Sequence, residues 1–509
     1  MKIMKKNIIA ISLALLSVGG WSCDDYLDVN QDPNVLSEIP DAKVLLPAVE
    51  IGLANQLMGW DFGFGGAYWT QYWTQSYDAS QFKSLCEYNE TSFSNAYNEL
   101  TAGVLNDLER MKSVSKDDAN KGNYYVAEAL SIFSWQIMTD VWGNVPYTEA
   151  LKGHDGIHSP EFDEGSAIYT DLLARADALL ALDLSASTLD KNYDFIYKGD
   201  LDKWTAFATS LKLKLMMRLS ETSGYDNAAV LSFIEANEFI SQSAMIPGAT
   251  WSDGEEGKRH PMREFEAGGA NNLSTNVIGC ASFIDYLKAG NDPRLDVLFA
   301  KGGDNHEGAF FGDFDSKEDT DDDGTDDADE DYSTAVFKGD MDLMIMSTWE
   351  VNFFIAEVYA RAGNNAKAKE YYDLGVEASL AQNDVADNDI IVNGYATWVD
   401  GDAEAGVKQI AMQKWVANCN YQHIESFLER NRTKYPSVNN IDIRKDRQTA
   451  YTEFVPGFIT ISVNGRAKTN AQLPVSPIYP LSVLTRNENA PSQKVDLLEK
   501  VWWNKKPGL

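Results

Sequence analysis

The stretch TWEVNFFIAEVYARAGNNAKAKEYYDLGVEASL (residues 348–380) decides the fold class of this 509-residue chain. Its apolar residues recur at three- and four-residue spacing, as they do on the buried face of an amphipathic helix. Small residues and tyrosines alternate along it at Ala356, Tyr359, Gly363, Ala368, Tyr372 and Gly375. Counted from Trp349, these six occupy positions 8, 11, 15, 20, 24 and 27. The pattern predicts a pair of helices that cross closely at the small residues.

Those positions match the offsets of a tetratricopeptide repeat, a 34-residue helix pair that stacks into a curved scaffold. An ordinary helical hairpin is the alternative. Helical spacing extends to four other segments, residues 95–111, 124–138, 168–182 and 204–219. Between the helices lie stretches rich in Gly, Asn, Asp and Pro, at residues 61–66, 153–160, 247–276, 301–332 and 383–401. Long loops in a compact chain usually bind or cover something, so we expect residues 245–345 and 383–402 to face a ligand or partner.

The charge of the chain excludes one large class of partners. Forty-three Lys and Arg residues stand against 77 Asp and Glu residues, a formal net charge of −34. Nucleic-acid binding needs clustered basic residues that neutralise phosphates, so nucleic acid is not an expected partner. The same sign disfavours electrostatic attraction to an anionic bilayer, so any membrane attachment has to be covalent or hydrophobic.

The N-terminal sequence indicates an export signal. Three lysines precede the apolar run IIAISLALLSV (residues 8–18), and a small residue, Ser22, then precedes Cys23. The run is too short to span a bilayer, which takes about 20 residues, so a signal peptide is favoured over a transmembrane helix. We expect removal of residues 1–22 and lipidation of Cys23, with ordinary secretion as the alternative. Cys86, Cys280 and Cys419 then remain, without zinc-site spacing, and are expected to be buried free thiols.

Signatures of catalysis are missing from the sequence. It contains no G-x-S-x-G, H-E-x-x-H, P-loop or dinucleotide-binding motif. His154 and His158 are four residues apart, but Gly153 and Gly156 predict a loop there instead of a metal-binding helix. We therefore expect no enzyme activity and no catalytic cofactor. A carboxylate pair for glycoside hydrolysis stays open, because only its separation in space would identify it.

An acidic segment matches the spacing of a calcium-binding loop. Residues 313–331 hold twelve acids and one lysine. Oxygen ligands at loop positions 1, 3, 5, 7, 9 and 12, with glycine at position 6, are what Ca²⁺ coordination requires. Gly324 occupies position 6, and the expected ligands are Asp319, Asp321, Asp323, the carbonyl of Thr325, Asp327 and Glu330. A structural Ca²⁺ is one reading of this segment, and a solvated acidic loop is the other.

Aromatic residues crowd into GWDFGFGGAYWTQYWTQSY (residues 59–77). Sugar rings stack their C–H faces on Trp and Tyr, so such a stretch suits a glycan. Tyr68, Trp69, Tyr72 and Trp73 also have helical spacing, however, and an aromatic stripe with that spacing is more often core. Two further tryptophans lie in predicted loops. The candidate ligand-binding residues are Trp60, Tyr72, Trp73, Tyr77, Trp251 and Trp398.

Segments spread along the whole chain resemble the SusD/RagB family, and in particular its second SusD-like branch. They are CDDYLDVNQDPN (23–34), VWGNVPYTEAL (141–151), NDPRLDVLF (291–299), WEVNFFIAEVYARAG (349–363), QKWVANCNYQHIESFLERNRTKYP (413–436) and VWWNKKP (501–507). The segment 473–491 is also similar, although Val483 stands where the family pattern has Glu. The resemblance implies a mostly α-helical SusD-like fold, with residues 23–509 forming one domain on a tetratricopeptide-like scaffold with long loop-rich insertions.

The same resemblance implies a function. Members are lipid-anchored on the outer face of the outer membrane, where they capture oligosaccharides, or in some cases peptides. They deliver the ligand to a SusC-like TonB-dependent barrel without chemistry. Ligand residues vary among members, so none is carried over to this chain. A non-catalytic oligosaccharide-binding lipoprotein is the expected function, a peptide-binding member is the alternative, and a secreted glycan hydrolase is less favoured.

Overall fold

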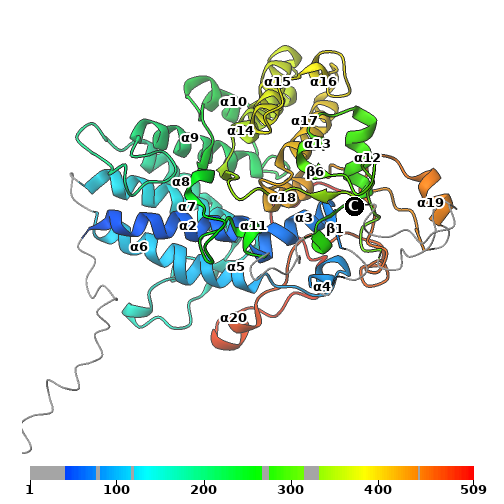
Figure 1. Ribbon diagram of the computed structural model, residues 1–509. Helices are drawn as coiled ribbons and strands as arrows, with labels where there is room; N and C mark the ends of the chain where they lie inside the picture. Colours follow the sequence, from blue (N-terminus) through cyan, green and yellow to red (C-terminus); the bar gives the residue numbers. More distant parts are fainter. Residues whose placement is uncertain are drawn as a thin grey trace, which may run out of the picture.

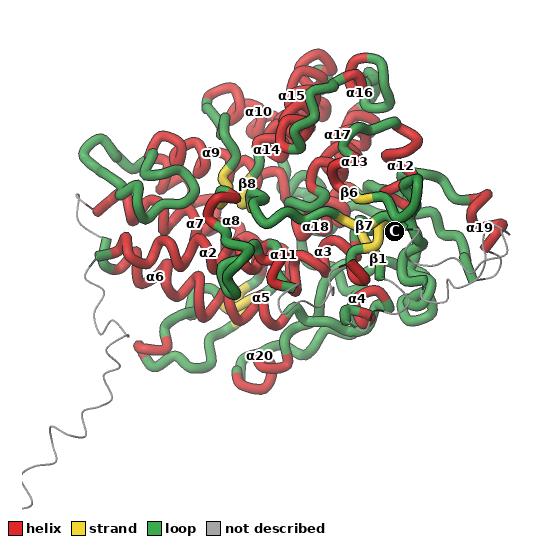
Figure 2. The backbone as a smooth tube through the Cα atoms, in the orientation of Figure 1, coloured by secondary structure: helices red, strands yellow, loops and turns green. Residues whose placement is uncertain are grey.

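The fold, seen in a computed structural model, is mostly helical (Figure 1). The structure describes residues 41–75, 79, 81–115, 120–265, 274–313, 332–444 and 447–508. Figure 2 shows helices filling the left and upper parts of the view, while loops dominate the right and lower edges. The predicted candidates Cys23, Tyr77 and the six calcium ligands between Asp319 and Glu330 lie outside the described residues.

Helices account for most of the elements. In the first half they are η1 (Ala42–Leu45), α2 (Leu46–Leu57), η2 (Trp60–Phe64), α3 (Gly65–Trp69), α4 (Lys83–Cys86), α5 (Ser94–Asn98), η3 (Glu99–Leu105), α6 (Asn106–Ser113), α7 (Lys121–Trp142), η5 (Gly153–Asp155), α8 (Gly165–Leu180), α9 (Leu201–Arg218) and α10 (Asn227–Ala236). In the second half they are η6 (Gly248–Thr250), α11 (Pro261–Glu264), η7 (Ser274–Asn276), α12 (Ala281–Gly290), α13 (Leu295–Leu298), α14 (Thr348–Arg361), α15 (Asn365–Gln382), α16 (Asp389–Val392), α17 (Ala403–Asn418), α18 (His423–Thr433), α19 (Arg447–Glu453) and α20 (Leu481–Arg486). None of the helices within the described ranges is long and apolar enough to cross a membrane.

The predicted helix pair is confirmed as α14 and α15. Ser347 caps α14 by accepting a hydrogen bond from the backbone of Glu350, and Asn364 caps α15 in the same way. The small residues lie where the helices cross, because a Cβ added to Gly375 would meet the ring of Phe353 at 2.6 Å. The helix α17 packs against both helices of the pair, and Gly406 faces Ala360 of α14. The other four predicted helical segments also form helices, namely α5 to α6 through η3, α7, α8 and α9.

The glycine-rich segment 61–66 is helical, which corrects the prediction of a loop. Residues 60–64 form the π-helix η2, and α3 follows directly. The glycines here permit close packing: a Cβ on Gly66 would lie 2.4 Å from the backbone carbon of His423 in α18, and one on Gly65 would lie 2.5 Å from the ring of Phe93. Composition alone suggested a loop, but these glycines let two helices approach with their backbones nearly in contact.

Short β-strands within the loop-rich segments pair with one another. A four-stranded antiparallel sheet has the order β1 (Trp73–Thr74), β5 (Ile278–Gly279), β7 (Thr334–Ala335) and β6 (Phe299–Ala300). Two antiparallel pairs join β2 (Val145–Pro146) with β3 (Phe162–Asp163) and β4 (Ala244–Ile246) with β8 (Leu343–Met346). The strand pairs hold together segments up to about 200 residues apart in sequence, so the long loops are anchored on the helical scaffold at defined points.

A network of buried charges joins the two halves of the helical scaffold. Arg218 of α9 donates to Asp140 of α7 at 2.9 Å and to Glu425 of α18 at 2.6 Å. Lys214 of α9 lies 2.8 Å from Glu350 of α14. All of these side chains are buried, and each charge has an oppositely charged partner, as burial of charge requires. The network fixes how α7, α9, α14 and α18 sit relative to one another.

Candidate functional site

Trp60 is the most exposed tryptophan in the described part of the chain, with 45% of its surface accessible. It is the first residue of the π-helix η2, and its ring packs against other aromatic rings. The ring centroid of Trp60 lies 4.2 Å from that of Phe82 and 5.2 Å from that of Phe265. The ring of Phe64 stacks on that of Phe82, with the two centroids 4.0 Å apart. We call Trp60, Phe64, Phe82 and Phe265 the aromatic platform.

The platform holds the ring of Trp60 in a fixed orientation while leaving much of it open to solvent. A rigid, half-exposed indole binds an apolar surface at little cost in side-chain entropy, because its rotamer is already set by its neighbours. The C–H face of a pyranose is such a surface. Of the five predicted ligand contacts that lie within the described residues, Trp60 is the one with an exposed ring that its aromatic neighbours hold in place.

Charged side chains flank the platform on the segment that carries Phe265. Arg263 of α11 pairs with Asp253 at 3.0 Å, and its hydrogen bond lowers the pKa of that carboxyl. His260 caps α11, and burial lowers its pKa to about 4, so its ring is neutral at physiological pH. Trp251 is half-buried with its ring 5.6 Å from His260, and its Nε1 has no hydrogen-bond partner among the described residues. This segment can supply polar contacts at the edge of the platform.

Tyr72 and Trp73 lie in the core, where their rings have no open face for a ligand. Both are 0% exposed. The hydroxyl of Tyr72 donates to the carbonyl of Trp415 at 2.5 Å, and the ring of Trp73 lies 4.6 Å from that of His423. Their prediction as ligand contacts is therefore wrong, and the alternative, core packing, holds. The helical spacing of the stripe does not hold either, because α3 ends at Trp69 and Trp73 lies in β1. A left-handed residue, Gln71, turns the chain between them.

Trp398 is also part of the core. Only 6% of its surface is exposed, and its ring lies 5.2 Å from Tyr372 of α15. Its Nε1 donates to Asp400 at 3.1 Å, so both the ring and the polar atom are used in packing the loop onto the helix pair. A tryptophan in a predicted loop therefore covers the scaffold here instead of presenting a ligand surface.

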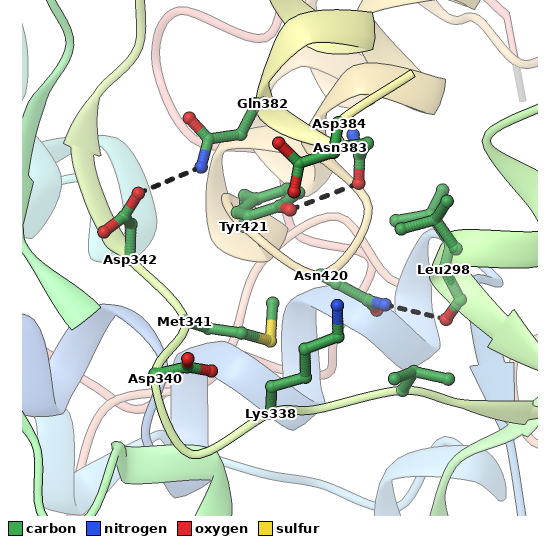
Figure 3. A pocket seen from close by; sticks show the side chains of 12 residues that line it. Leu298, Lys338, Asp340, Met341, Asp342, Gln382, Asn383, Asp384, Asn420 and Tyr421 are labelled. Carbon is green, nitrogen blue, oxygen red and sulfur yellow. Dashed lines mark hydrogen bonds between the residues drawn. The ribbon is translucent and has the colours of Figure 1, made fainter. Parts of the chain in front are cut away.

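A polar pocket of about 210 Å³ lies between the turn before β8, the end of α15 and the turn between α17 and α18 (Figure 3). Its groups largely bond one another: Gln382 donates to Asp342 at 3.2 Å, and Tyr421 donates to Asn383 at 3.2 Å. Lys338 extends its ammonium into the middle of the pocket. Tyr421, the one aromatic ring of the lining, is 8% exposed, so the pocket lacks the open ring that stacks on a sugar.

Within the described residues we identify no metal-binding cluster. They contain no group of three or more His, Cys, Asp and Glu side chains able to hold an ion. His154 lies in the turn η5, as the glycines around it predict. Glu357 and Glu429, two carboxyls with markedly lowered pKa values, are buried and paired with Arg432, so they belong to the core. Cys86, Cys280 and Cys419 are confirmed as buried free thiols.

Sequence reasoning did not find Phe82 and Phe265, which support Trp60. Phe82 lies 22 residues along the chain and Phe265 lies in the loop-rich region, so no spacing connects them with Trp60. Their partnership arises only where η2 and α11 meet. The glycine pattern around Trp60 was the one local signal, since it allows the π-helix to present this ring.

Comparison with known proteins finds matches among SusD-like proteins. Residues 33–453 match the profile of a SusD-like family described as starch-binding and associating with the outer membrane. Among solved structures, a SusD homologue from Bacteroides uniformis superposes with a TM-score of 0.71 at 22% identity, covering 91% of this chain and 99% of that one. A chitin-binding SusD homologue from Flavobacterium johnsoniae superposes with a TM-score of 0.64 at 17% identity, covering 92% and 99%. A comparison with curated protein sequences finds no match.

Proposed function

Because the chain belongs to the SusD-like family of starch-binding proteins that associate with the outer membrane, we propose that it captures a neutral oligosaccharide by stacking it on Trp60. The exposed face of Trp60 on its aromatic platform is the observation that carries this proposal. The pair of Arg263 and Asp253 and the half-buried Trp251 lie on the neighbouring segment, where they can meet the hydroxyl groups of the sugar. Binding of this kind involves no bond breaking.

We further propose that the protein is lipidated at Cys23, faces the cell exterior and passes its ligand to a SusC-like TonB-dependent barrel. The signal-like N-terminus and the family description support the anchor. The net charge of −34 keeps such a surface protein soluble and discourages nonspecific association. Co-purification of the barrel with the full chain, and its loss in a Cys23→Ser variant that is released from the membrane, would test the arrangement.

The binding proposal is tested by calorimetry on the soluble chain lacking residues 1–23, titrated with chitohexaose and with maltohexaose. Replacing Trp60 with Ala should weaken binding at least tenfold, which corresponds to a loss of about 1.4 kcal/mol. Tyr451→Ala is the matched control, because Tyr451 is also an exposed aromatic, 40% accessible, but lies in α19 away from the platform. Its affinity should equal that of the wild type.

Three outcomes would contradict the proposal in different ways. Unchanged affinity of the Trp60→Ala variant would show that the sugar binds elsewhere. Release of reducing ends by the wild-type protein would identify a hydrolase. Binding of a lysine-rich peptide together with no binding of either hexasaccharide would favour a peptide ligand, which the acidic charge of the chain could attract.

The acidic segment 313–331 supports a separate proposal, a structural Ca²⁺ held by Asp319, Asp321, Asp323, Thr325, Asp327 and Glu330. Only the sequence spacing supports it, since the six lie outside the described residues. Calcium should raise the melting temperature relative to chelator, and an Asp321→Asn, Asp323→Asn variant should lose that difference. Equal melting temperatures of the wild type in Ca²⁺ and in chelator would remove the proposal.

A further inference from the structure

A second cleft, of about 680 Å³, lies among the N-terminal helices between α6, α8 and the connection from β2 to β3. These elements stand at the left of Figure 1, whereas α11 of the platform lies near its centre. No residue of the aromatic platform lines this cleft. Ligand pockets in proteins usually enclose roughly 300 to 1,000 Å³, so the cleft has the size of a ligand-binding site.

The cleft contains an aromatic side chain held in place by three neighbours. Tyr147, which is half-buried, lies with its ring centroid 5.0 Å from that of Trp135. Its hydroxyl accepts a hydrogen bond from Nη1 of Arg175 at 2.7 Å and donates one to Asp171. Arg175 is itself fixed by Glu128, with its Nε 2.6 Å from Oε1. The exposed part of the Tyr147 ring therefore has a set orientation, as does Trp60 in the platform.

Polar side chains reach the cleft from separate elements. Asn106 and Arg110 come from the first and second turns of α6, and His154 and Asp155 come from the turn η5. Within the described part of the chain, neither the His154 ring nor the Asp155 carboxylate forms a hydrogen bond or ion pair, so both are available to a ligand. Burial of a sugar hydroxyl requires such partners, because an unpaired buried hydroxyl costs free energy.

The charge of the cleft differs from that of the molecule. Three basic side chains and four acidic ones line it, so its formal charge is −1, against −34 for the whole chain. Several of these charges already pair with each other or with the backbone, as Lys152 does with the carbonyl of Thr148. A strongly anionic or cationic ligand would find no complementary field here. An uncharged ligand with many hydroxyl groups fits both the polar groups and the near-neutral charge.

From these observations we propose that the cleft is a second saccharide-binding site, in which a sugar ring packs on Tyr147 while Asn106, Arg110 and Asp155 bond its hydroxyls. The proposal rests on the function proposed above, because both sites would bind the same class of ligand. Two sites on one chain raise the avidity for a long glycan, since binding at one raises the effective concentration at the other.

The test uses chitotriose and maltotriose, which are too short to be gripped by two separate sites at once. Ala167 is exposed on α8 and lines the cleft, so Ala167→Trp fills it from a helix surface. Ala178→Trp is the matched control, because Ala178 is exposed on the same helix and does not line the cleft. Calorimetry of the wild type should give two trisaccharides per chain, and Ala167→Trp should give one. Trp60→Ala should likewise give one, and the double variant none.

The outcomes separate this inference from the proposed function. If Ala167→Trp matches Ala178→Trp in stoichiometry and affinity while Trp60→Ala abolishes binding, the cleft is not a site and the platform is. If Trp60→Ala changes nothing while Ala167→Trp abolishes binding, the platform is wrong and the cleft stands. No binding of either trisaccharide or hexasaccharide by the wild type overturns both.

A milder variant guards against misfolding of Ala167→Trp. Asp155→Ala removes a carboxylate without a partner in the described structure, so the melting temperature should stay that of the wild type. Affinity at one of the two sites should fall at least threefold. Unchanged affinity at both sites in Asp155→Ala together with unchanged stoichiometry in a folded Ala167→Trp protein would overturn the inference.

Discussion

Replacing Glu357 with Gln removes one negative charge from a buried cluster in which Arg432 also pairs with Glu429 and Arg361 also pairs with Glu221. Glu357 lies in α14 and is 2% exposed. Its two carboxylate oxygens accept hydrogen bonds from Nη1 and Nη2 of Arg432, both at 2.6 Å, and Oε1 lies 2.8 Å from Nη2 of Arg361. Glutamine has nearly the same shape, so the change tests the charge and leaves the packing intact.

The magnitude follows from two independent arguments. Burial by itself raises the pKa of Glu357, but the charges of Arg432 and Arg361 outweigh burial and lower the pKa to about 2 from 4.5. The difference between these two pKa values corresponds to roughly 3 kcal/mol. Removing one partner of a buried ion pair typically costs about 3 to 5 kcal/mol. We therefore expect Glu357→Gln to lower the free energy of unfolding by about 3 kcal/mol at pH 7.

The assay is urea unfolding followed by circular dichroism, with Glu370→Gln as the control. Glu370 is also a carboxylate of the helix pair, but its ion pair with Lys367 is about half exposed, so solvent screens it and it should contribute little to stability. The pKa of Glu357 is lowered on folding, so its contribution is complete above pH 4.5 and is lost as pH falls towards 2. Equal stability of Glu357→Gln and Glu370→Gln at pH 7 would refute the reasoning.

Three further predictions follow from the core. Burial lowers the pKa of His423 to about 3, so between pH 6.5 and 3 the unfolded chain binds a proton that the folded chain does not. The free energy of unfolding should therefore fall by about 2 kcal/mol as the pH falls from 6.5 to 5, and His423→Gln should lessen that slope in urea titrations. Gly66→Ala should lower the free energy of unfolding by about 3 kcal/mol, because the added Cβ would clash with the backbone of α18. Gly103→Ala is the control and should not lower it, because its Cβ would only contact Glu99 at 3.5 Å. Equal urea midpoints for the two variants would contradict this. Burial raises the pKa of each of the three cysteine thiols that remain in the chain lacking residues 1–23. A thiol reagent should therefore label three cysteines per chain in denaturant and none in buffer. Fast labelling of the native protein would contradict this. The three are Cys86, Cys280 and Cys419.

The helix pair was predictable because its determinants are local. The small residues at the crossing and the apolar spacing both lie within residues 348–380, and the structure confirms the helix pair that they predict. The glycine-rich segment 61–66 was misread for the opposite reason. Glycine favours loops on average, and only the approach of His423, more than 350 residues later, shows why Gly66 is helical here.

The sequence by itself determined the helical scaffold and the family. Only the tertiary structure decided which aromatic residues are available to a ligand. Trp60 and Trp73 lie in the same stretch, yet one is 45% exposed and the other 0%. Exposure depends on what packs over a ring, and the residues over Trp73, Phe337 and His423, come from distant parts of the chain. Secondary structure follows from neighbours in sequence, whereas a binding surface follows from which side chains the fold leaves uncovered.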